Sequence, residues 1–304
     1  MKKINHAALF ICLSLTLGMA SSGSALTGEE INSFFQELSG KVDMTKANVS
    51  LIDLTDPDNP ARGGYMDHNI VPVASVIKLT LLAGVYRAAR EDGLSFDRVI
   101  TINKANYTGT WFPDNDPYPA MKPGQQWKVR DIIEVMIRRS DNIATNTLID
   151  LLNRNVVNDF MKKLGLENTG IRHKLSSEID VQDPEATGWN SMPPYDAATI
   201  LGLIASEKMV SADASKAMYA TLSGQMDTEL IKEALPPEAS YAGKTGELAA
   251  ARNDAAIIKA PGRTYILVIF VRLPNPTAKP IIHSITKEVD AFIKAHHPPA
   301  AESI

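Results

Sequence analysis

A serine and a lysine three residues apart can form a reactive pair in this sequence. Ser75 and Lys78 lie within Val71–Tyr86, whose other residues are almost all apolar or small. In a helix, residues three apart share one face, so the hydroxyl and the amine would stand side by side. Apolar residues on nearly every side indicate a helix buried in a core. Burial disfavours a charged lysine, and a neutral amine beside a serine hydroxyl is a base beside a nucleophile.

The alternative is a structural helix whose Lys78 extends its amine to the solvent. A second pair with the same spacing, Ser284 and Lys287, shows that the spacing alone has little specificity. Two later tripeptides add specificity, because Ser140-Asp141-Asn142 and Lys244-Thr245-Gly246 follow the first pair in this order. Each tripeptide is expected by chance well under about 0.1 times in a chain of this length. Together the three motifs predict a site built around a serine nucleophile.

The elements that must position these motifs follow a mixed order. Strands are expected at both ends of the chain, around 47–54, 65, 255–259 and 265–272, with helices between them. Terminal helices are expected near 27–40, where Thr27 and Glu30 form a capping box, and at 280–296. This order predicts an α+β fold with one antiparallel sheet and a helical middle. We expect residues 26–70 and 210–304 to form an α/β lobe and residues 71–209 a helical lobe.

The first 25 residues have the pattern of an export signal. Two lysines precede an apolar stretch from residue 7 to about residue 20, and small residues lead to Ala25. We expect cleavage near Ala25 and a periplasmic or secreted protein without a membrane anchor, because the apolar stretch is shorter than a span of about 20 residues. The only cysteine, Cys12, lies in this segment, so the mature chain is expected to have no disulfide and no thiolate metal site.

Composition limits the classes of partner. The chain has 304 residues, 44% of them hydrophobic, and a formal net charge of −4, which argues against a nucleic-acid-binding surface. Short basic clusters such as Arg138-Arg139 are expected on solvated faces. The histidines lack the spacing of metal ligands, so we expect neither a metal nor another cofactor. A monomer is expected.

The three motifs, in this order, resemble those of the class A β-lactamase family and its penicillin-binding relatives. Ser191-Met192-Pro193 before a helix and Asn253-Asp254 after the third motif add to the resemblance, which covers nearly all of the mature chain. The resemblance implies an antiparallel sheet flanked by helices, a three-layer sandwich, beside an all-helical lobe. The active site would lie between the two lobes.

The resemblance also implies roles for the motif residues. Ser75 would attack an amide carbonyl and Lys78 would take its proton. Ser140 would relay a proton to the leaving nitrogen, with Lys244 nearby as a second cation. Asn142 can hold a substrate side-chain amide through its donor and its acceptor.

Further groups would bind the substrate's charges. Lys244, Thr245 and Gly246 suit a substrate carboxylate, and the backbone N–H groups of Ser75 and Glu247 would form the oxyanion hole. Asp141 is expected to fix its loop and to take no part in the chemistry. Arg252 is expected to be an ordinary surface arginine, with contact to a substrate carboxylate as the alternative. Tyr107 and Trp111, in the long segment 103–123, are expected either to cover the core or to contact substrate.

The loop after the second motif departs from the class A pattern. That family carries a Glu-x-x-Leu-Asn segment whose glutamate positions the water that frees the enzyme. Here Leu175, or a close neighbour, lies at the expected place of the glutamate. Glu178 follows three residues later and Glu185 further on, neither with Leu-Asn at the family's spacing. Acylation is therefore expected, whereas deacylation depends on Glu178 or on Lys78.

Three functions fit these residues. The leading one is an exported serine hydrolase that opens β-lactam amides through an acyl-enzyme on Ser75. The alternative is a penicillin-binding D-alanyl-D-alanine carboxypeptidase that acts on peptidoglycan stem peptides. The third is a slowly deacylating β-lactam-binding protein.

Overall fold

A five-stranded antiparallel sheet is the centre of the protein. The computed structural model describes residues 25–109, 116–176 and 183–298. The strands are ordered β2-β1-β9-β8-β7, so the first and last parts of the chain share one sheet. Their bounds are β1 Ala47–Asp53, β2 Ala61–Tyr65, β7 Ser240–Leu248, β8 Ala251–Ala260 and β9 Arg263–Val271. The expected antiparallel sheet is confirmed.

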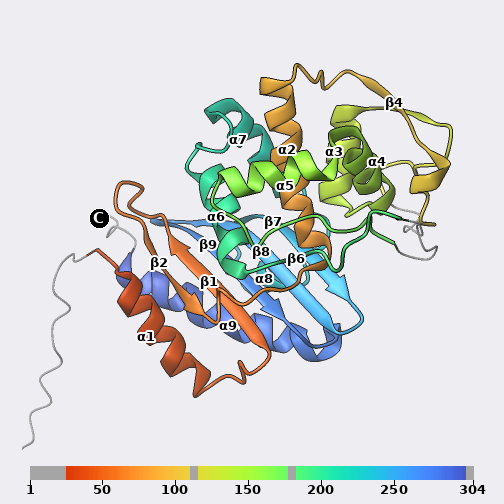
Figure 1. Cartoon of the computed structure of the whole chain (residues 1–304). Coiled ribbons are helices and arrows are strands. Elements are labelled where there is room, and N and C mark those ends of the chain that lie inside the picture. The colour runs from red at the N-terminus through yellow and green to blue at the C-terminus, as the bar shows by residue number, and fades with distance from the viewer. Residues whose placement is uncertain (1–24, 110–115, 177–182, 299–304) are drawn as a thin grey trace, which may run out of the picture.

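Two terminal helices cover one face of this sheet. They are α1 (Gly28–Ser39) and α9 (Asn275–His296), the red and blue helices that lie side by side below the sheet (Figure 1). The predicted capping box begins α1: Thr27 Oγ1 accepts a hydrogen bond from Glu30 N, and Thr27 N donates to Glu30 Oε2 at 2.8 Å. Apolar side chains of both helices, such as Phe35 and Ile285, are fully buried against the strands.

The opposite face is covered by the middle of the chain. Its helices are α2 Lys78–Glu91, α3 Val129–Arg138, α4 Asn142–Leu152, α5 Arg154–Lys163, α6 Pro194–Ala205, α7 Ala212–Ser223 and the short α8 Ile231–Ala234. Helix α6 lies on β1, β8 and β9, and α7 lies beside β7. The buried apolar side chains of α2 to α5 belong to the same core. Figure 1 shows these helices on the side of the sheet opposite α1 and α9. The structure therefore has helices on both sides of one sheet and a helical region beside it.

Short elements connect the helices to the sheet. The strand β3 (Val71–Pro72) pairs with β6 (Ser191–Met192), and β4 (Val99–Thr101) pairs with β5 (Gln126–Lys128). Two short 3-10 helices, η1 (Ala74–Ile77) and η2 (Lys104–Asn106), precede longer elements.

The expected α+β class is confirmed, while the expectations for the segment from Val71 and for Arg139 are wrong. The segment from Val71 is not one helix: Val71–Pro72 is the strand β3, and Ala74, with φ +50°, begins η1, which leads into α2. Arg139 is not solvated: its side chain is buried and pairs with two aspartates. The division into lobes at residues 70 and 209 stays a prediction, and the expected signal lies outside the described residues.

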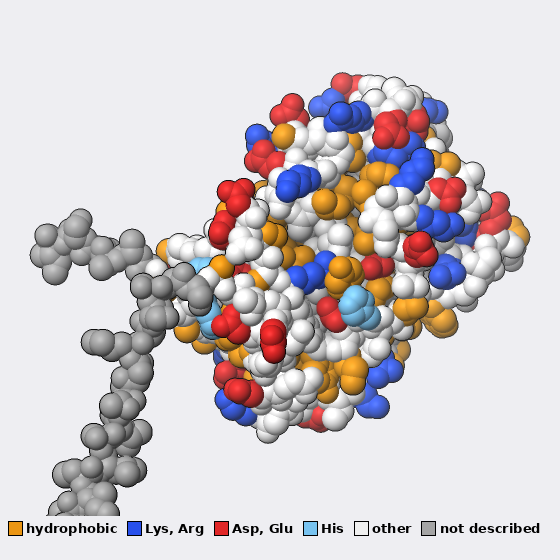
Figure 2. Space-filling view, turned by 60° about the vertical axis from the view of Figure 1, so that its left-hand side comes forward, with side chains coloured by type: hydrophobic (Ala, Val, Ile, Leu, Met, Phe, Trp, Pro, Cys, Tyr) orange, Lys and Arg blue, Asp and Glu red, His pale blue; other side chains and the backbone are white. Residues whose placement is uncertain are grey.

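The surface carries charges of both signs. On the face shown in Figure 2, acidic and basic side chains alternate around a hollow, with hydrophobic side chains between them. Within the described ranges, no helix has the length and apolar composition needed to cross a membrane.

Candidate active site

Ser75 lies in the one-turn helix η1, directly before α2. The backbone N–H of Lys78 donates to Ser75 O, so the two residues are joined across one turn as their spacing predicted. Every residue of α2 from Lys78 to Val85 is buried, which confirms that this helix belongs to a core. Ala74, just before the serine, is in the left-handed region that non-glycine residues rarely adopt. Such local strain often marks a functional site.

The third motif lies in β7 and approaches η1 at Gly246. A Cβ atom at this position would lie 2.5 Å from Val73 O and 3.1 Å from Ser75 N. Only glycine therefore allows β7 to come this close to the nucleophile's backbone. The contact brings Thr245 and Glu247, on either side of Gly246, to the serine.

The second motif forms the turn between α3 and α4. Ser140 has φ +62°, again in the left-handed region. Asp141 caps α4, because its Oδ1 accepts from Ala144 N at 2.9 Å, and its Oδ2 accepts from Arg139 Nη2 at 2.9 Å. Arg139 also donates to the backbone oxygens of Tyr118 and Pro119. This geometry supports the expected structural role of Asp141.

Lys78 joins the first motif to the second. Its Nζ lies 2.6 Å from Ser140 O, 3.0 Å from Ser140 Oγ and 2.9 Å from Asn142 Oδ1. An ammonium donates to all three oxygens. A neutral amine donates its two hydrogens to Ser140 O and Asn142 Oδ1. It accepts a hydrogen bond from the Ser140 hydroxyl, which then acts as the donor. Both protonation states of Lys78 are therefore fully hydrogen-bonded.

Burial determines which protonation state Lys78 prefers. Its side chain is completely buried. This burial, together with the positive charge of Lys244, lowers the pKa of Lys78 well below its ordinary value, and the negative charge of Asp141 opposes the shift. A neutral amine is the form that can accept the proton of Ser75. Among the described residues, Lys78 Nζ hydrogen-bonds to Ser140 and Asn142 and not to Ser75, so one rotation must precede proton transfer.

Lys244 is the second buried lysine. Burial lowers the pKa of its ammonium from the ordinary 10.5 to about 7, while the negative charges of Asp227 and Asp254 oppose the fall. Its Nζ donates to Thr245 O at 2.9 Å. Burial also raises the pKa of Asp254 to about 7, although the Tyr241 hydroxyl bonds its carboxylate at 2.7 Å. Lys244 thus carries only a partial charge near neutral pH.

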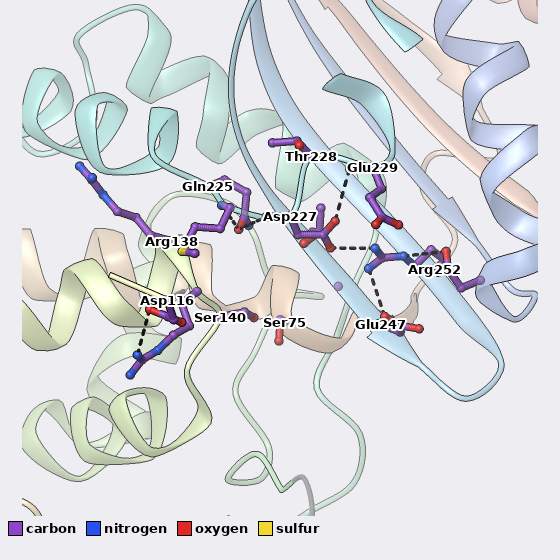
Figure 3. Close-up of a pocket in the computed structure, with 15 residues that line it drawn as sticks. Ser75, Asp116, Arg138, Ser140, Gln225, Asp227, Thr228, Glu229, Glu247 and Arg252 are labelled. Atoms are coloured by element: carbon purple, nitrogen blue, oxygen red, sulfur yellow. Dashed lines mark hydrogen bonds and ion pairs between the residues drawn. The ribbon is translucent and has the colours of Figure 1, made fainter. Parts of the chain in front are cut away.

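Ser75 lines two cavities. The larger, of about 640 Å³, lies between the second and third motifs, and Figure 3 shows Ser75 between Ser140 on the helical side and Arg252 on the sheet side. Its other lining residues are Asp116, Arg138, Arg139, Gln225, Met226, Asp227, Thr228, Glu229, Thr245, Gly246, Glu247 and Asn275. The smaller, of about 120 Å³, lies toward the loop after α5 and includes Asn142, Leu175 and Glu247.

Arg252 contradicts the expectation of a surface arginine. Its side chain is only 4% exposed, because Nη2 pairs with Asp227 at 2.7 Å and Nε donates to Asn275 Oδ1 at 3.1 Å. Nη1 lies 3.5 Å from Glu247 Oε2. No sequence pattern indicated this cluster, since the strand β7 lies between Asp227 and Arg252 in the chain.

Three asparagines fix the loop segment 170–176. Asn158 bonds both backbone groups of Ile171, and Asn190 bonds the backbone of residues 172 and 173. Asn146 bonds both backbone groups of Leu175, at 2.8 Å and 2.7 Å. These amides were not identified from sequence, because an isolated asparagine has no distinguishing spacing. They hold Leu175 on the wall of the smaller cavity.

The two glutamates considered for deacylation lie differently. Glu178 lies outside the described residues. Glu185 is 75% exposed and lies 3.6 Å from Arg154 Nε, on the wall of a different cavity. Among the described residues that line the smaller cavity, Glu247 has the only carboxylate. Leu175, which with its close neighbours was expected at the place of the base, thus lies on the wall of a cavity that Ser75 also lines.

Two other expectations concern aromatic residues and metals. Tyr107 is half-buried and packs against the core, whereas Trp111 lies outside the described residues. Over residues 25–109, 116–176 and 183–298, no cluster of histidine, cysteine or acidic side chains has the geometry of a metal site.

Comparisons with known proteins agree with this geometry. Residues 29–293 match the model of the beta-lactamase enzyme family. A beta-lactamase of Streptomyces cellulosae is 26% identical over 216 residues, 69% of this chain and 68% of that protein. One of Bacteroides uniformis is 25% identical over 281 residues, 86% and 88% of the two chains.

A solved structure has the same fold. The structure of PBP-A is 25% identical and has a TM-score of 0.74, covering 86% of this chain and 96% of PBP-A. A mutant of PBP-A was solved as an acyl-enzyme complex with penicillin G; it is 24% identical, covers 86% of this chain and 97% of its own, and has a TM-score of 0.73.

Proposed function

The chain belongs to the beta-lactamase enzyme family, and we propose that it is an exported serine hydrolase that opens β-lactam amides through an acyl-enzyme on Ser75. The observation that carries the proposal is the position of Lys78. A fully buried amine with a lowered pKa, bonded to Ser140 and Asn142 and one turn from Ser75, is a base prepared beside a nucleophile.

Acylation uses side chains of the first two motifs and the backbone of Glu247, directly after the third. Lys78 Nζ takes the hydroxyl proton as Ser75 Oγ attacks the carbonyl carbon. The amide C–N bond then breaks, and its nitrogen takes a proton from the Ser140 hydroxyl, which the Lys78 ammonium replaces across 3.0 Å. The backbone N–H groups of Ser75 and Glu247 would hold the oxyanion, at about 3 kcal/mol for each donor in such sites.

The remaining polar groups would hold the substrate. Asn142 Oδ1 becomes available to an amide of the substrate side chain once Lys78 turns to Ser75, and Nδ2, which donates one hydrogen to Ser176 O at 3.1 Å, has a second hydrogen to donate. Lys244 and Thr245 would bind the substrate carboxylate. Gly246 allows their strand, β7, to come close to the backbone of Ser75. This part of the proposal is supported by the lining of the larger cavity by Thr245 and Gly246.

Deacylation is proposed to be slower than acylation. The attacking water needs a base within hydrogen-bond reach, either directly or through one water. Leu175 offers none, so the base is Glu178 or Lys78, and Lys78 can serve only once the relay through Ser140 has returned it to the neutral amine. The rate of turnover is then set by hydrolysis of the ester on Ser75.

A second candidate follows from the same observation at Leu175. A penicillin-binding D-alanyl-D-alanine carboxypeptidase would use the same acylating residues on peptidoglycan stem peptides. The overall similarity to PBP-A, together with a leucine at the expected place of the base, supports this alternative. A β-lactam would then remain bound as a long-lived adduct.

Two turnover assays separate these functions. A chromogenic cephalosporin is mixed with the full mature chain, and hydrolysis is followed over many equivalents. Sustained turnover supports the hydrolase, and one stoichiometric burst supports the slowly deacylating binding protein. Release of D-alanine from a pentapeptide, in the same preparation, supports the carboxypeptidase.

The nucleophile is tested by labelling with a fluorescent penicillin. Ser75→Ala should abolish the label, and Ser284→Ala, which alters the second serine-lysine pair, should leave it unchanged. A label that persists in Ser75→Ala and disappears in Ser284→Ala would refute the assignment.

Export is tested by the mass of the protein recovered from outside the cytoplasm of an expressing cell. We expect a chain that begins near residue 26. A full-length chain that stays in the cytoplasm would contradict the proposed signal.

A further inference from the structure

The larger cavity contains a carboxylate of the protein itself at the place proposed for the substrate carboxylate. Asp227 lies in the connection between α7 and α8 and lines the cavity together with Thr245. Figure 3 shows Asp227 and Ser75 on the walls of this cavity. The side chain of Asp227 is about one-third exposed, so it reaches the open cavity and is not enclosed in the core.

Asp227 already uses the groups that would bind an anion. Arg252 Nη2 donates to its Oδ2 at 2.7 Å, and Thr245, on the wall of the same cavity, lies close enough to help lower the pKa of this carboxyl. Its negative charge also opposes the fall in the pKa of Lys244. Thr245 and Lys244 are the residues proposed to bind the substrate carboxylate. The free protein thus satisfies its anion-binding groups with an internal anion.

Burial raises the pKa of Asp227, but the charge of Arg252, the hydrogen bonds from Arg252 and Glu229 N, and the nearby Thr245 hold the pKa below its ordinary value. The carboxylate is therefore ionised at neutral pH. Two carboxylates at one site repel each other, so a substrate carboxylate cannot join Asp227 at Thr245 without cost. One of the two must leave.

The second oxygen of the Asp227 carboxylate is held weakly. Glu229 N donates to this Oδ1 across a long distance, 3.5 Å. The backbone of the connection is held separately, because Met226 N donates to Arg138 O at 2.9 Å. Rotation of the Asp227 side chain can therefore vacate Thr245 and Arg252 without moving the chain.

We propose that Asp227 is an internal substitute for the substrate carboxylate, which a bound β-lactam must displace from Thr245 and Arg252. The inference rests on the proposed function and adds a residue that sets specificity. Asp227 lowers the affinity for substrates with a carboxylate at this position and does not affect uncharged analogues. Its negative charge also balances the positive charges of Arg252 and Lys244 while no substrate is bound.

The test compares benzylpenicillin with its methyl ester in a Ser75→Ala background, where binding is measured by calorimetry without acylation. Asp227→Asn keeps the shape and removes the charge, so it should strengthen binding of the acid on the order of tenfold and leave the ester unchanged. Asp227→Glu should keep the low affinity for the acid. Glu229→Gln is the matched control, since it removes one carboxylate from the same cavity wall without contact to Thr245.

Each outcome decides the inference. If Asp227→Asn weakens or does not change binding of the acid, Asp227 only positions Arg252 and the inference is wrong. An equal gain in affinity for the acid in Glu229→Gln would mean that any negative charge on this cavity wall weakens binding, and the specific role of Asp227 would be wrong. Thermal unfolding of each variant confirms that the comparison uses folded protein. Labelling of Ser75 in the otherwise unaltered protein tests the proposed function separately, because binding in Ser75→Ala does not depend on acylation.

Discussion

The two buried lysines are suited to different tasks because their surroundings differ. Lys78 is bonded to three oxygens and has a pKa well below its ordinary value, which suits a base. Lys244 bonds to Thr245 O and has a pKa near 7, which places its charge change in the physiological range. The proposed anion subsite should therefore depend on pH.

We predict that affinity for a carboxylated β-lactam falls as the pH rises through about 7. The pKa of Lys244 is depressed by burial, so the ammonium that binds the carboxylate predominates only below this value. Binding to Ser75→Ala, measured by calorimetry at several pH values with the methyl ester as reference, would show the fall for the acid alone. Lys244→Arg should flatten the profile, because an arginine stays charged.

Asp254 has a pKa of about 7 as well, and its ionisation adds a negative charge near the subsite. Its contribution is retained in Lys244→Arg. An unchanged fall in that variant would therefore assign the pH dependence to Asp254 and contradict the prediction for Lys244.

A carboxylate introduced at residue 175 should shorten the life of the acyl-enzyme. Leu175 is on the wall of the cavity that Ser75 and Asn142 share, and Asn146 fixes its backbone through both polar groups. Leu175→Glu therefore places a base where the deacylating water is expected, and general bases contribute on the order of 10² or more to a rate. The adduct's decay is followed by mass spectrometry.

Leu175→Gln provides the control for this variant. It has the size and polarity of glutamate but cannot take a proton from water. An equally fast decay in Leu175→Gln would mean that the polar side chain opens the loop and that no base has been supplied.

At the scale of elements, the site depends on how closely β7 approaches η1. We predict that Gly246→Ala destabilises the protein by about 1–3 kcal/mol, as overpacking does in cores. The added methyl would meet Val73 O at 2.5 Å and must move η1 or β7. A misplacement of about 1 Å can cost on the order of 10² in rate. The acylation rate of the folded protein should therefore fall as well, by more than the loss of folded molecules explains.

Gly202→Ala in α6 is a suitable control for the glycine variant. Its Cβ would meet only Ile52 Cδ1, at 3.4 Å, and alanine favours the helix. Urea unfolding and the rate of penicillin labelling are measured for both. Normal labelling in Gly246→Ala would show that the close approach is not needed for acylation.

The sequence predicted the elements of the site better than their connections. The residue types of the three motifs indicated Ser75, Lys78 and Lys244, and periodicity indicated the sheet and the flanking helices. It could not predict the left-handed conformations of Ala74 and Ser140, because neither residue type favours them. Tertiary contacts impose such conformations, and local patterns do not contain those contacts.

Burial of charged residues was the second feature that sequence reasoning could not supply. Arg139 and Arg252 resemble surface residues when read alone, since arginine is seldom fully buried without a partner. Each is buried because aspartates compensate its charge: Asp116 and the neighbouring Asp141 for Arg139, and Asp227 for Arg252. The pairs with Asp116 and Asp227 join segments that are distant in the sequence, so they leave no periodic signal.

At the scale of the molecule, the sheet separates two cores. The core toward α2 and α6 supports Ser75, and the core toward α1 and α9 contains none of the motif residues. A defect in the second core should therefore change stability without changing the chemistry of the folded protein. The buried ion pair between β9 and α9 allows a direct test.

We predict that Asp290→Ala lowers the free energy of unfolding by about 3–5 kcal/mol, the cost of breaking a buried ion pair by removing one partner. Asp290 accepts from Arg263 Nη2 at 2.9 Å and from the Tyr265 hydroxyl at 2.8 Å, so its loss leaves a buried guanidinium and a buried hydroxyl unpaired. Lys279→Ala, on the same helix, removes a solvent-exposed pair with Glu233 and should barely change the unfolding midpoint. Penicillin labelling per folded molecule, measured well below the midpoint, should be the same in both variants. A slower label in Asp290→Ala at full folding would mean that the sheet transmits changes in α9 to Ser75 and that the two cores are not independent.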